Sequence, residues 1–331
     1  LPDRNGVLVG MSGGVDSGFA ALRLKEAGFR VAGITLRLWE EDERTGARSC
    51  CSLEAVRRAR ETAHSLGLPH LTVDASAAFR SQVIEYFVAE YAAGRTPNPC
   101  LKCNARLRFD LMLRVAHLLG WERIATGHYA RLTGERQCLS RGADGKKDQS
   151  YVLAEVSPIL LRQVLFPLGE MTKEEVRALA VQVGLRHHSA PESQEICFVP
   201  AGEHRRFLRE RLGQSWGDIV HVDGTLLGRH SGIYNFTVGQ RRGVRVAAGR
   251  PLYVVALDAE AGSVVVGTKA DTAVGAVYLG SLVCHDPDEG GPLTVQLRVE
   301  NLTDKAYREH GSGVDQPGRG VSLSVEYRVG P

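Results

Sequence analysis

The feature that most constrains this chain is an apolar run leading into a glycine-rich turn, Val7-Leu-Val-Gly-Met-Ser-Gly-Gly-Val-Asp-Ser17. A stretch with helical periodicity follows from Phe19 to Ala27, so the order predicts a strand, a tight loop and a helix N-terminus. The first turn of a helix carries unpaired N–H groups and the positive end of the helix dipole, and both favour an anion. The sequence therefore predicts a phosphate-binding loop directly after the first strand.

The side chains of this loop suit a nucleotide phosphate. Gly13 and Gly14 let the backbone approach a ligand closely. Ser12 and Ser17 add hydroxyl donors, and Asp16 can hold a metal ion or orient the loop. No lysine follows as in the Walker loop, and the pattern instead resembles the PP-loop of ATP pyrophosphatases. That resemblance implies binding of ATP, adenylation of an oxygen on a second substrate and release of pyrophosphate.

Strand and helix patterns alternate through the amino-terminal half of the chain. Further strands are expected at Val31–Leu36, Leu71–Asp74 and Arg123–Thr126, and helices at 53–66, 81–93 and 105–119. This alternation is typical of the α/β class with a doubly wound parallel sheet, whose ligands bind beyond the carboxyl ends of the strands. Residues 10–17, Leu36 and the pair Gly127-His128 are therefore expected to meet in one crevice.

Length and pattern together predict three domains. A chain of 331 residues is longer than a single hydrophobic core usually supports. Beyond Cys197 a basic helix, 203–212, leads into short strands broken by glycines. We therefore divide the chain into a catalytic domain at 1–202, a small central domain at 203–272 and a C-terminal β domain at 273–331.

Composition excludes several classes of protein. The chain is 43% hydrophobic and 24% charged, as in ordinary globular proteins, and no stretch is typical of a membrane span or a secretory signal. We expect a cytoplasmic protein without a membrane partner. The seven cysteines favour reduced thiols with a chemical or metal-binding role over a disulfide framework. A net charge of +3 permits a nucleic-acid partner without requiring one.

The second informative stretch is Thr96-Pro-Asn-Pro-Cys-Leu-Lys-Cys-Asn104, a proline-fixed loop that ends in Cys-x-x-Cys just before a predicted helix. Cysteines at such a position tend to have a lowered pKa, because the helix dipole stabilises the reactive thiolate. Cys197 lies in a separate motif, Glu192-Ser-Gln-Glu-Ile-Cys-Phe198. Together with a loop that activates ATP, paired thiols indicate sulfur transfer.

Several motifs in this order resemble the bacterial tRNA-specific 2-thiouridylase family, which places sulfur on the wobble uridine of certain tRNAs. The matching stretches extend from residue 7 to about 270 and are 10–17, 94–99, 103–104, 125–129, 147–151, 196–198 and Thr237-Val-Gly-Gln-Arg-Arg-Gly243. The resemblance implies a PP-loop domain, a small central domain and a C-terminal β-barrel.

The same resemblance implies a role for each matching residue. ATP, with Mg²⁺, would be held by Gly10, Met11, Ser12, Gly13, Gly14, Val15, Asp16, Ser17, Leu36 and Gly127. The target base would face Asn98, Pro99 and Cys100, and the tRNA would contact His128, Lys147, Asp148 and Gln149. Cys103 would be the nucleophile, and Cys197 would carry a persulfide supplied by a sulfur-relay donor protein. No residue is assigned as a structural metal ligand.

The chemistry allows more than one route. The uridine C2 oxygen leaves only after adenylation, and a sulfur nucleophile can then displace AMP. Cys103 either attacks the persulfide, releasing sulfide and leaving a disulfide with Cys197, or frees a persulfide that attacks the base directly. Many members have Asp where Cys100 stands, so Cys100, Cys103 and Cys197 are also the ligands of a less favoured alternative, an iron-sulfur cluster.

Two rival functions follow from the same motifs. A PP-loop amide-forming ligase would use ammonia instead of sulfur, but no separate ammonia-producing domain is evident. A tRNA-binding module would use the nucleotide loop only as a switch, and the cysteines on a proline-fixed loop argue against it.

The end of the chain departs from the family pattern after about Arg298. The alternating segment Val321-Ser-Leu-Ser-Val-Glu-Tyr327 and the residues before it resemble the last strands of a TonB-dependent outer-membrane receptor. One hairpin cannot make a membrane barrel. We interpret the tail as the product of a shifted reading frame or of a chimeric chain, and expect the C-terminal domain to be incomplete.

Overall fold

The computed structural model describes residues 3–39, 53–135, 137–188, 196–199, 202–246, 248–273 and 283, and the strand segments 293–300, 307–308, 315–316 and 320–327. The chain divides into two compact units. The first comprises Leu1–Ile84, Pro99–Pro200 and Val283–Asp286, and the second comprises Glu85–Asn98, Ala201–Leu282 and Pro287–Pro331. The division into three domains stays a prediction, since much of 273–331 lies outside the described residues.

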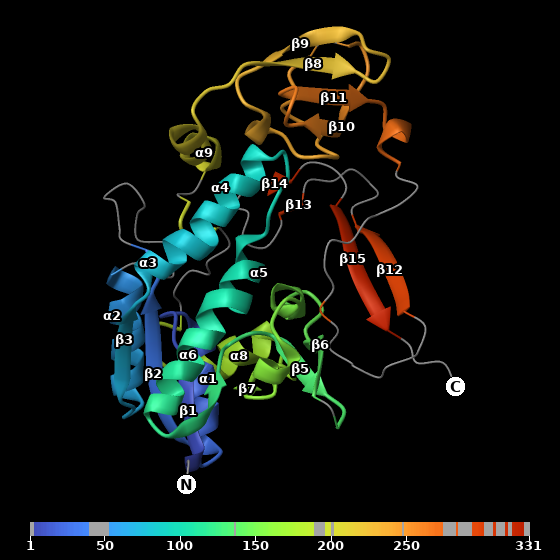
Figure 1. The fold of residues 1–331 in the computed structure, drawn as a ribbon. Coiled ribbons are helices and arrows are strands. Elements are labelled where there is room, and N and C mark those ends of the chain that lie inside the picture. The colour runs from blue at the N-terminus through green and yellow to red at the C-terminus, as the bar shows by residue number, and fades with distance from the viewer. Residues whose placement is uncertain are drawn as a thin grey trace. The chain divides into compact units, whose positions relative to one another are not determined.

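The first unit is built on a five-stranded parallel sheet with the order β3-β2-β1-β4-β7 (Figure 1). Its strands are β1 (Asp3–Gly10), β2 (Arg30–Arg37), β3 (His70–Asp74), β4 (Trp121–Ala125) and β7 (Val164–Leu165). The α/β doubly wound sheet is therefore confirmed. Strand order reverses between β1 and β4, which is where a ligand site is expected in this topology.

Helices and short turns complete the first unit. They are α1 (Val15–Glu26), α2 (Leu53–Ser65), α3 (Ser76–Phe79), α5 (Pro99–Cys103), α6 (Phe109–Leu118), α7 (Pro158–Leu161) and α8 (Lys173–Gln182), the π-helical turns η1 (Arg80–Ile84) and η2 (Asn104–Arg108), the 3-10 turn η3 (Ser150–Leu153), and the hairpin of β5 (Ala130–Thr133) and β6 (Cys138–Arg141). Helix α8 begins with a complete capping box between Thr172 and Glu175.

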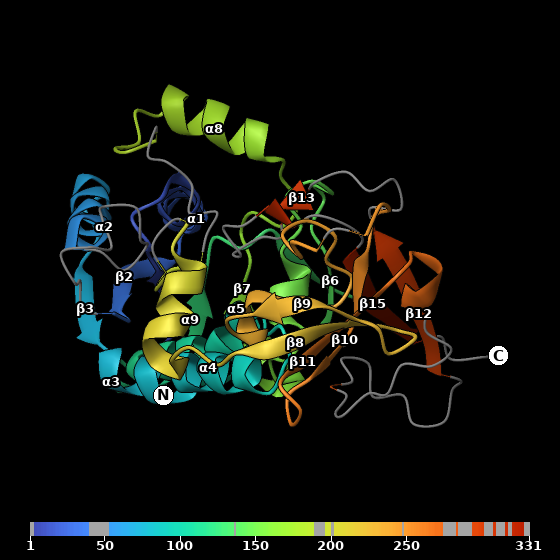
Figure 2. The ribbon, with the colours of Figure 1, turned by 90° about the horizontal axis from the view of Figure 1, so that it is seen from above.

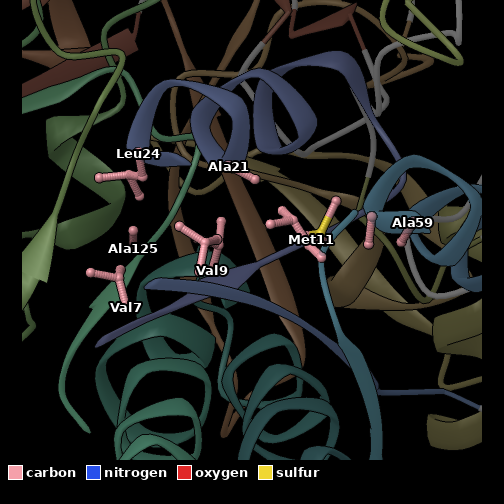
Figure 3. Packing of buried hydrophobic residues seen from close by; sticks show 10 residues of the cluster. Val7, Val9, Met11, Ala21, Leu24, Ala59 and Ala125 are labelled. Carbon is pink, nitrogen blue, oxygen red and sulfur yellow. The ribbon is translucent and has the colours of Figure 1, made fainter. Parts of the chain in front are cut away.

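The second half of β1, from Val7 to Val9, is apolar because both faces of the sheet are covered there. Val7, Leu8 and Val9 are fully buried, as is typical of a central parallel strand. Figure 3 shows Val7, Val9 and Met11 packed toward α1, where Ala21 and Leu24 belong to the same cluster. This core holds β1 and α1 in place, and with them the loop that joins the two elements.

The second unit contains a four-stranded sheet with the order β10-β11-β8-β9. Its elements are α4 (Glu85–Ala92), α9 (His204–Leu212), β8 (Gly217–His221), β9 (Leu226–His230), η4 (Ile233–Asn235), β10 (Tyr253–Asp258), β11 (Ser263–Gly267) and η5 (Ala270–Thr272). Helices α4 and α9 lie side by side (Figure 2), joined by the edge-on rings of Phe87 and Phe207. The basic helix and short strands expected beyond Cys197 are thus present.

Four further strands lie in the tail: β12 (Leu293–Glu300), β13 (Tyr307–Arg308), β14 (Asp315–Gln316) and β15 (Gly320–Tyr327). Strands β12 and β15 pair antiparallel along their whole length, so the alternating segment is a strand as expected. The likeness of this tail to a receptor stays a prediction. Within the described parts of the chain, no helix has the length and apolarity to cross a membrane.

Candidate active site

The loop between β1 and α1 is fixed by its two serines. The N–H of Ser12 donates to the Ser17 hydroxyl at 3.1 Å, and that hydroxyl donates to the carbonyl of Gly14 at 3.1 Å. Gly13 has a φ of +77°, and a Cβ there would lie 2.4 Å from the carbonyl oxygen of Ala55. Only glycine fits this position. The loop is a preformed turn at the start of a helix, as phosphate binding requires.

Strand β2 fixes the other side of the loop. The N–H of Met11 donates to the carbonyl of Ile34 at 2.8 Å, and the Thr35 hydroxyl donates to the carbonyl of Met11 at 2.8 Å. That hydroxyl therefore accepts from Nε2–H of His70 at 2.9 Å. Burial lowers the pKa of His70 to about 4, so its ring is neutral at pH 7. Leu36 lies near the carboxyl end of β2, one strand away from the loop.

The segment after β4 closes on the start of α1. A Cβ on Gly127 would lie 2.8 Å from the carbonyl carbon of Asp16 and 2.8 Å from the nitrogen of Ser17. His128 follows, and its Nδ1 is 2.8 Å from the Thr126 hydroxyl. The expected meeting of residues 10–17 with Gly127 thus occurs within the first unit.

Replacing Gly127 by alanine is expected to displace the first turn of α1, because the new methyl group would clash with backbone atoms. We expect a loss of about 1–3 kcal/mol of stability from overpacking and a larger relative loss of ATP-dependent activity. Gly145→Ala is the matched control, since nothing lies within 4 Å of its Cβ position. Thermal unfolding measures the loss of stability, and pyrophosphate release measures the loss of activity. Equal stability and activity of the two variants would contradict the close contact between Gly127 and the first turn of α1.

Asp16 is held by a buried lysine from α8. The Lys173 ammonium lies 2.7 Å from both carboxylate oxygens of Asp16, and its side chain is only 3% exposed against 31% for Asp16. The Tyr129 hydroxyl donates to the same carboxylate at 2.8 Å. The N–H of Lys173 donates to Asp144 at 3.0 Å, and this bond is the main cause that lowers the pKa of Asp144.

Residues 142–150 are tied to the same network. The Gln149 side chain accepts the N–H of Tyr129 at 3.0 Å, and the N–H of Gln149 donates back to the Tyr129 carbonyl at 2.9 Å. Asp148 accepts from the N–H of Gly142 and from the N–H and hydroxyl of Ser150. The side chains of Asp148 and Gln149 therefore shape a turn that reaches Asp16 through Tyr129, and their contact with tRNA stays a prediction, as it does for Lys147 and His128.

Helix α5 places two cysteines one turn apart. Cys100 is half-buried and Cys103 is buried at 5% exposure. The helix is anchored at its carboxyl end, where Lys102 pairs with Glu155 at 2.6 Å and the Asn104 amide donates to the Val152 carbonyl at 3.0 Å. Residues three apart lie on one face of a helix, so Cys100 shares a face with the expected nucleophile.

Cys197 is positioned by its neighbour Phe198. The Phe198 ring is 1% exposed and packs edge-on against Phe79, with 5.5 Å between ring centroids. Phe79 ends α3, and the π-helical turn η1 that follows it packs against α5. A continuous set of contacts in the first unit therefore links the surroundings of Cys197 to the helix that carries Cys103.

Not every predicted residue lies in the first unit. Asn98 belongs to the second, whereas Pro99 and Cys100 belong to the first. Cys50 and Cys51 lie outside the described residues. Among the residues described, no group of three or more His, Cys, Asp or Glu side chains is arranged to hold a metal ion.

Sequence reasoning missed Lys173, Tyr129 and His70. Tyr129 was inside a recognised motif but had no assigned role. A lysine at the first position of a helix opposes the helix dipole, and this anomaly at Lys173 was the available signal. His70 begins an ordinary strand and carried no signal at all.

Comparison with known proteins places this geometry in a family. A family model described as tRNA methyl transferase HUP domain matches residues 5–201, and one described as tRNA methyl transferase PRC-barrel domain matches residues 205–268.

Individual relatives agree with these matches. The tRNA-specific 2-thiouridylase MnmA of Acidothermus cellulolyticus is 46% identical over 334 residues, covering 98% of this chain and 90% of that protein. The protein of the same name from Mycobacterium leprae is 42% identical over 343 residues, covering 98% and 95%. The bifunctional protein NifU/MnmA of Rubrobacter xylanophilus is 47% identical over 311 residues, covering 94% of this chain and 63% of that protein. The chain therefore belongs to the tRNA-specific 2-thiouridylase family.

Proposed function

We propose that this chain is a tRNA-uridine 2-sulfurtransferase that adenylates the C2 oxygen of the wobble uridine and then transfers sulfur from a cysteine persulfide. The observation that carries the proposal is the preformed loop at the start of α1, closed by Gly127, in the same unit as Cys103 and Cys197. A nucleotide loop and two thiols are the parts that such a reaction needs.

The residues present suit ATP as a substrate. Backbone N–H groups of the first turn of α1, and the cradle left by Gly13 and Gly14, supply the surroundings that a polyphosphate requires. The C2 oxygen attacks the α-phosphate, the bond to the β-phosphate breaks, and pyrophosphate leaves. The uridine then carries AMP on C2, which makes that oxygen a leaving group.

Asp16 does not fit the role of a Mg²⁺ ligand in this arrangement. Both of its oxygens accept hydrogen bonds from the Lys173 ammonium, and one also accepts from Tyr129. A cation is thus already supplied at this carboxylate by the chain itself. We infer that Asp16 orients the loop, and no step is assigned to the metal ion.

Sulfur transfer then uses the two cysteines. A persulfide on Cys197, loaded by a sulfur-relay donor protein, is attacked by the Cys103 thiolate at the sulfur nearest the protein. A Cys103–Cys197 disulfide forms and hydrosulfide is released. Hydrosulfide adds to C2, AMP leaves, and the C2=S bond forms with loss of a proton. A dithiol reductant supplies two electrons to restore both thiols.

The test is direct. The protein is incubated with ATP, a persulfide donor and unmodified tRNA, and the nucleosides are analysed by mass spectrometry. We expect 2-thiouridine, AMP and pyrophosphate in equal amounts. Thiouridine formation without AMP release would contradict adenylation. Incorporation of ammonia in place of sulfur would favour the amide-forming ligase.

A further inference from the structure

The motif Thr237-Val-Gly-Gln-Arg-Arg-Gly243 has no part in the mechanism above, yet it forms a built loop in the second unit. The N–H of Gly239 donates to the Val254 carbonyl at 2.8 Å, and the N–H of Val254 donates to the Gln240 carbonyl at 2.9 Å. The Gln240 side chain accepts the N–H of Thr237 at 2.9 Å and donates to the Arg242 carbonyl at 2.8 Å. The loop is therefore held against β10 in one conformation.

This loop presents exposed arginines next to those of helix α9. Arg241 and Arg242 are exposed at its tip. Arg205 of α9 reaches it, because one guanidinium nitrogen lies 3.3 Å from the Cβ position of Gly243. Arg209 is exposed one turn further along α9, on the same face as Arg205. We call Arg205, Arg209, Arg241 and Arg242 the basic surface.

Two acidic residues at α9 pair with an arginine outside the basic surface. Glu203 and Glu210 both pair with Arg206, at 3.4 Å and 2.9 Å. Four exposed arginines gathered in one unit give a positive field, which attracts a polyanion.

The basic surface is joined to the loop expected to face the target base. The Thr96 hydroxyl donates to the Thr237 hydroxyl at 3.1 Å. A Cβ on Gly94 would lie 3.2 Å from Cβ of Leu257 and 3.8 Å from the side chain of Ile233, so Gly94 packs on β10 and η4. Asn98 follows two residues after Thr96. The loop 237–243 therefore begins at Thr237, which is hydrogen-bonded to the segment expected to face the target base.

We propose that the basic surface binds the sugar-phosphate backbone of the tRNA beside the target uridine. This rests on the proposed function, since it assumes that the polyanion is the RNA substrate. Phosphate contacts position a nucleic acid without reading its sequence. The surface fixes where the RNA backbone runs, and the segment around Asn98 is carried by the same packed unit.

The experiment compares the wild type with the double variant R241Q/R242Q in tRNA affinity, salt dependence and thiolation. We expect affinity to fall about tenfold at low salt, and the slope of log K against log salt to become shallower by about 1.4–1.8, for two lost phosphate contacts. KM for tRNA should rise while kcat at saturating tRNA is kept. Arg229→Gln is the matched control, because this exposed arginine of the same unit is paired with Asp218.

The outcomes separate the two proposals. Unchanged affinity and slope in the double variant would overturn the basic surface, whether or not the wild type makes thiouridine. A lowered affinity and slope would support it, and would do so even if the wild type bound tRNA without modifying it, in which case the proposed function alone fails. An equal loss of tRNA affinity in Arg229→Gln would also overturn it, since removing any exposed arginine would then weaken binding as much.

Discussion

Lys173→Met is expected to lower kcat/KM for ATP about a hundredfold, equivalent to about 2.7 kcal/mol. The Lys173 ammonium contacts both oxygens of Asp16 at 2.7 Å. Without it, the carboxylate at the first turn of α1 repels the phosphates that the helix N-terminus attracts. Because Asp16 is about one third exposed, solvent screens part of this charge, and the loss is smaller than for a fully buried pair.

The double variant Asp16→Asn with Lys173→Met gives the decisive comparison. Asp16→Asn alone leaves a buried ammonium without its counter-charge, so we expect a lowered Tm as well as lost activity. The double variant removes both charges, and should recover stability and part of the ATP affinity. Thermal unfolding and the KM for ATP measure this cycle, with the exposed Lys146→Met as control. If the double variant recovered none of the ATP affinity, the result would mean that Lys173 contacts the nucleotide itself.

Local features of the chain were predictable because they depend on neighbours in sequence. The apolar run of β1, the glycine turn after it and the capping box of α8 each specify their own geometry. The parallel sheet followed from the alternation of strand and helix. The pairing of Asp16 with Lys173 was not accessible, because the two are 157 residues apart and no local pattern records which distant side chain meets the loop.

The helices around the cysteines show a second limit of sequence reasoning. A continuous helix was expected over 81–93, but the chain forms the π-helical turn η1 up to Ile84 and then α4. Likewise 105–119 begins with the turn η2 before α6. A π-helical turn inserts one residue into the helical repeat, and a 3.6-residue periodicity cannot register that insertion. Both turns lie next to α5, so the irregularity occurs where the cysteines are presented.

The two sulfur mechanisms make opposite predictions for Cys100→Asp. In the disulfide mechanism only Cys103 and Cys197 change oxidation state, so the variant should keep its activity and stay free of iron. A carboxylate at this position can also assist proton transfer near the base. In the cluster mechanism Cys100 is a ligand, and its loss should release iron and stop turnover.

We expect the first result, because Cys103 is buried in a helix whose surroundings connect to Cys197 through Phe79 and Phe198. The wild type and the variants Cys100→Asp, Cys103→Ser and Cys197→Ser are purified without oxygen, and iron content, visible absorption and thiolation rate are measured on each. Cys138→Ser, in strand β6, controls for the loss of any thiol. Activity should fall to background in Cys103→Ser and Cys197→Ser only, with every sample colourless. A brown wild type beside a colourless, inactive Cys100→Asp would contradict the redox pair and support a metal cluster. The iron would then depend on the Cys100 thiolate as a ligand.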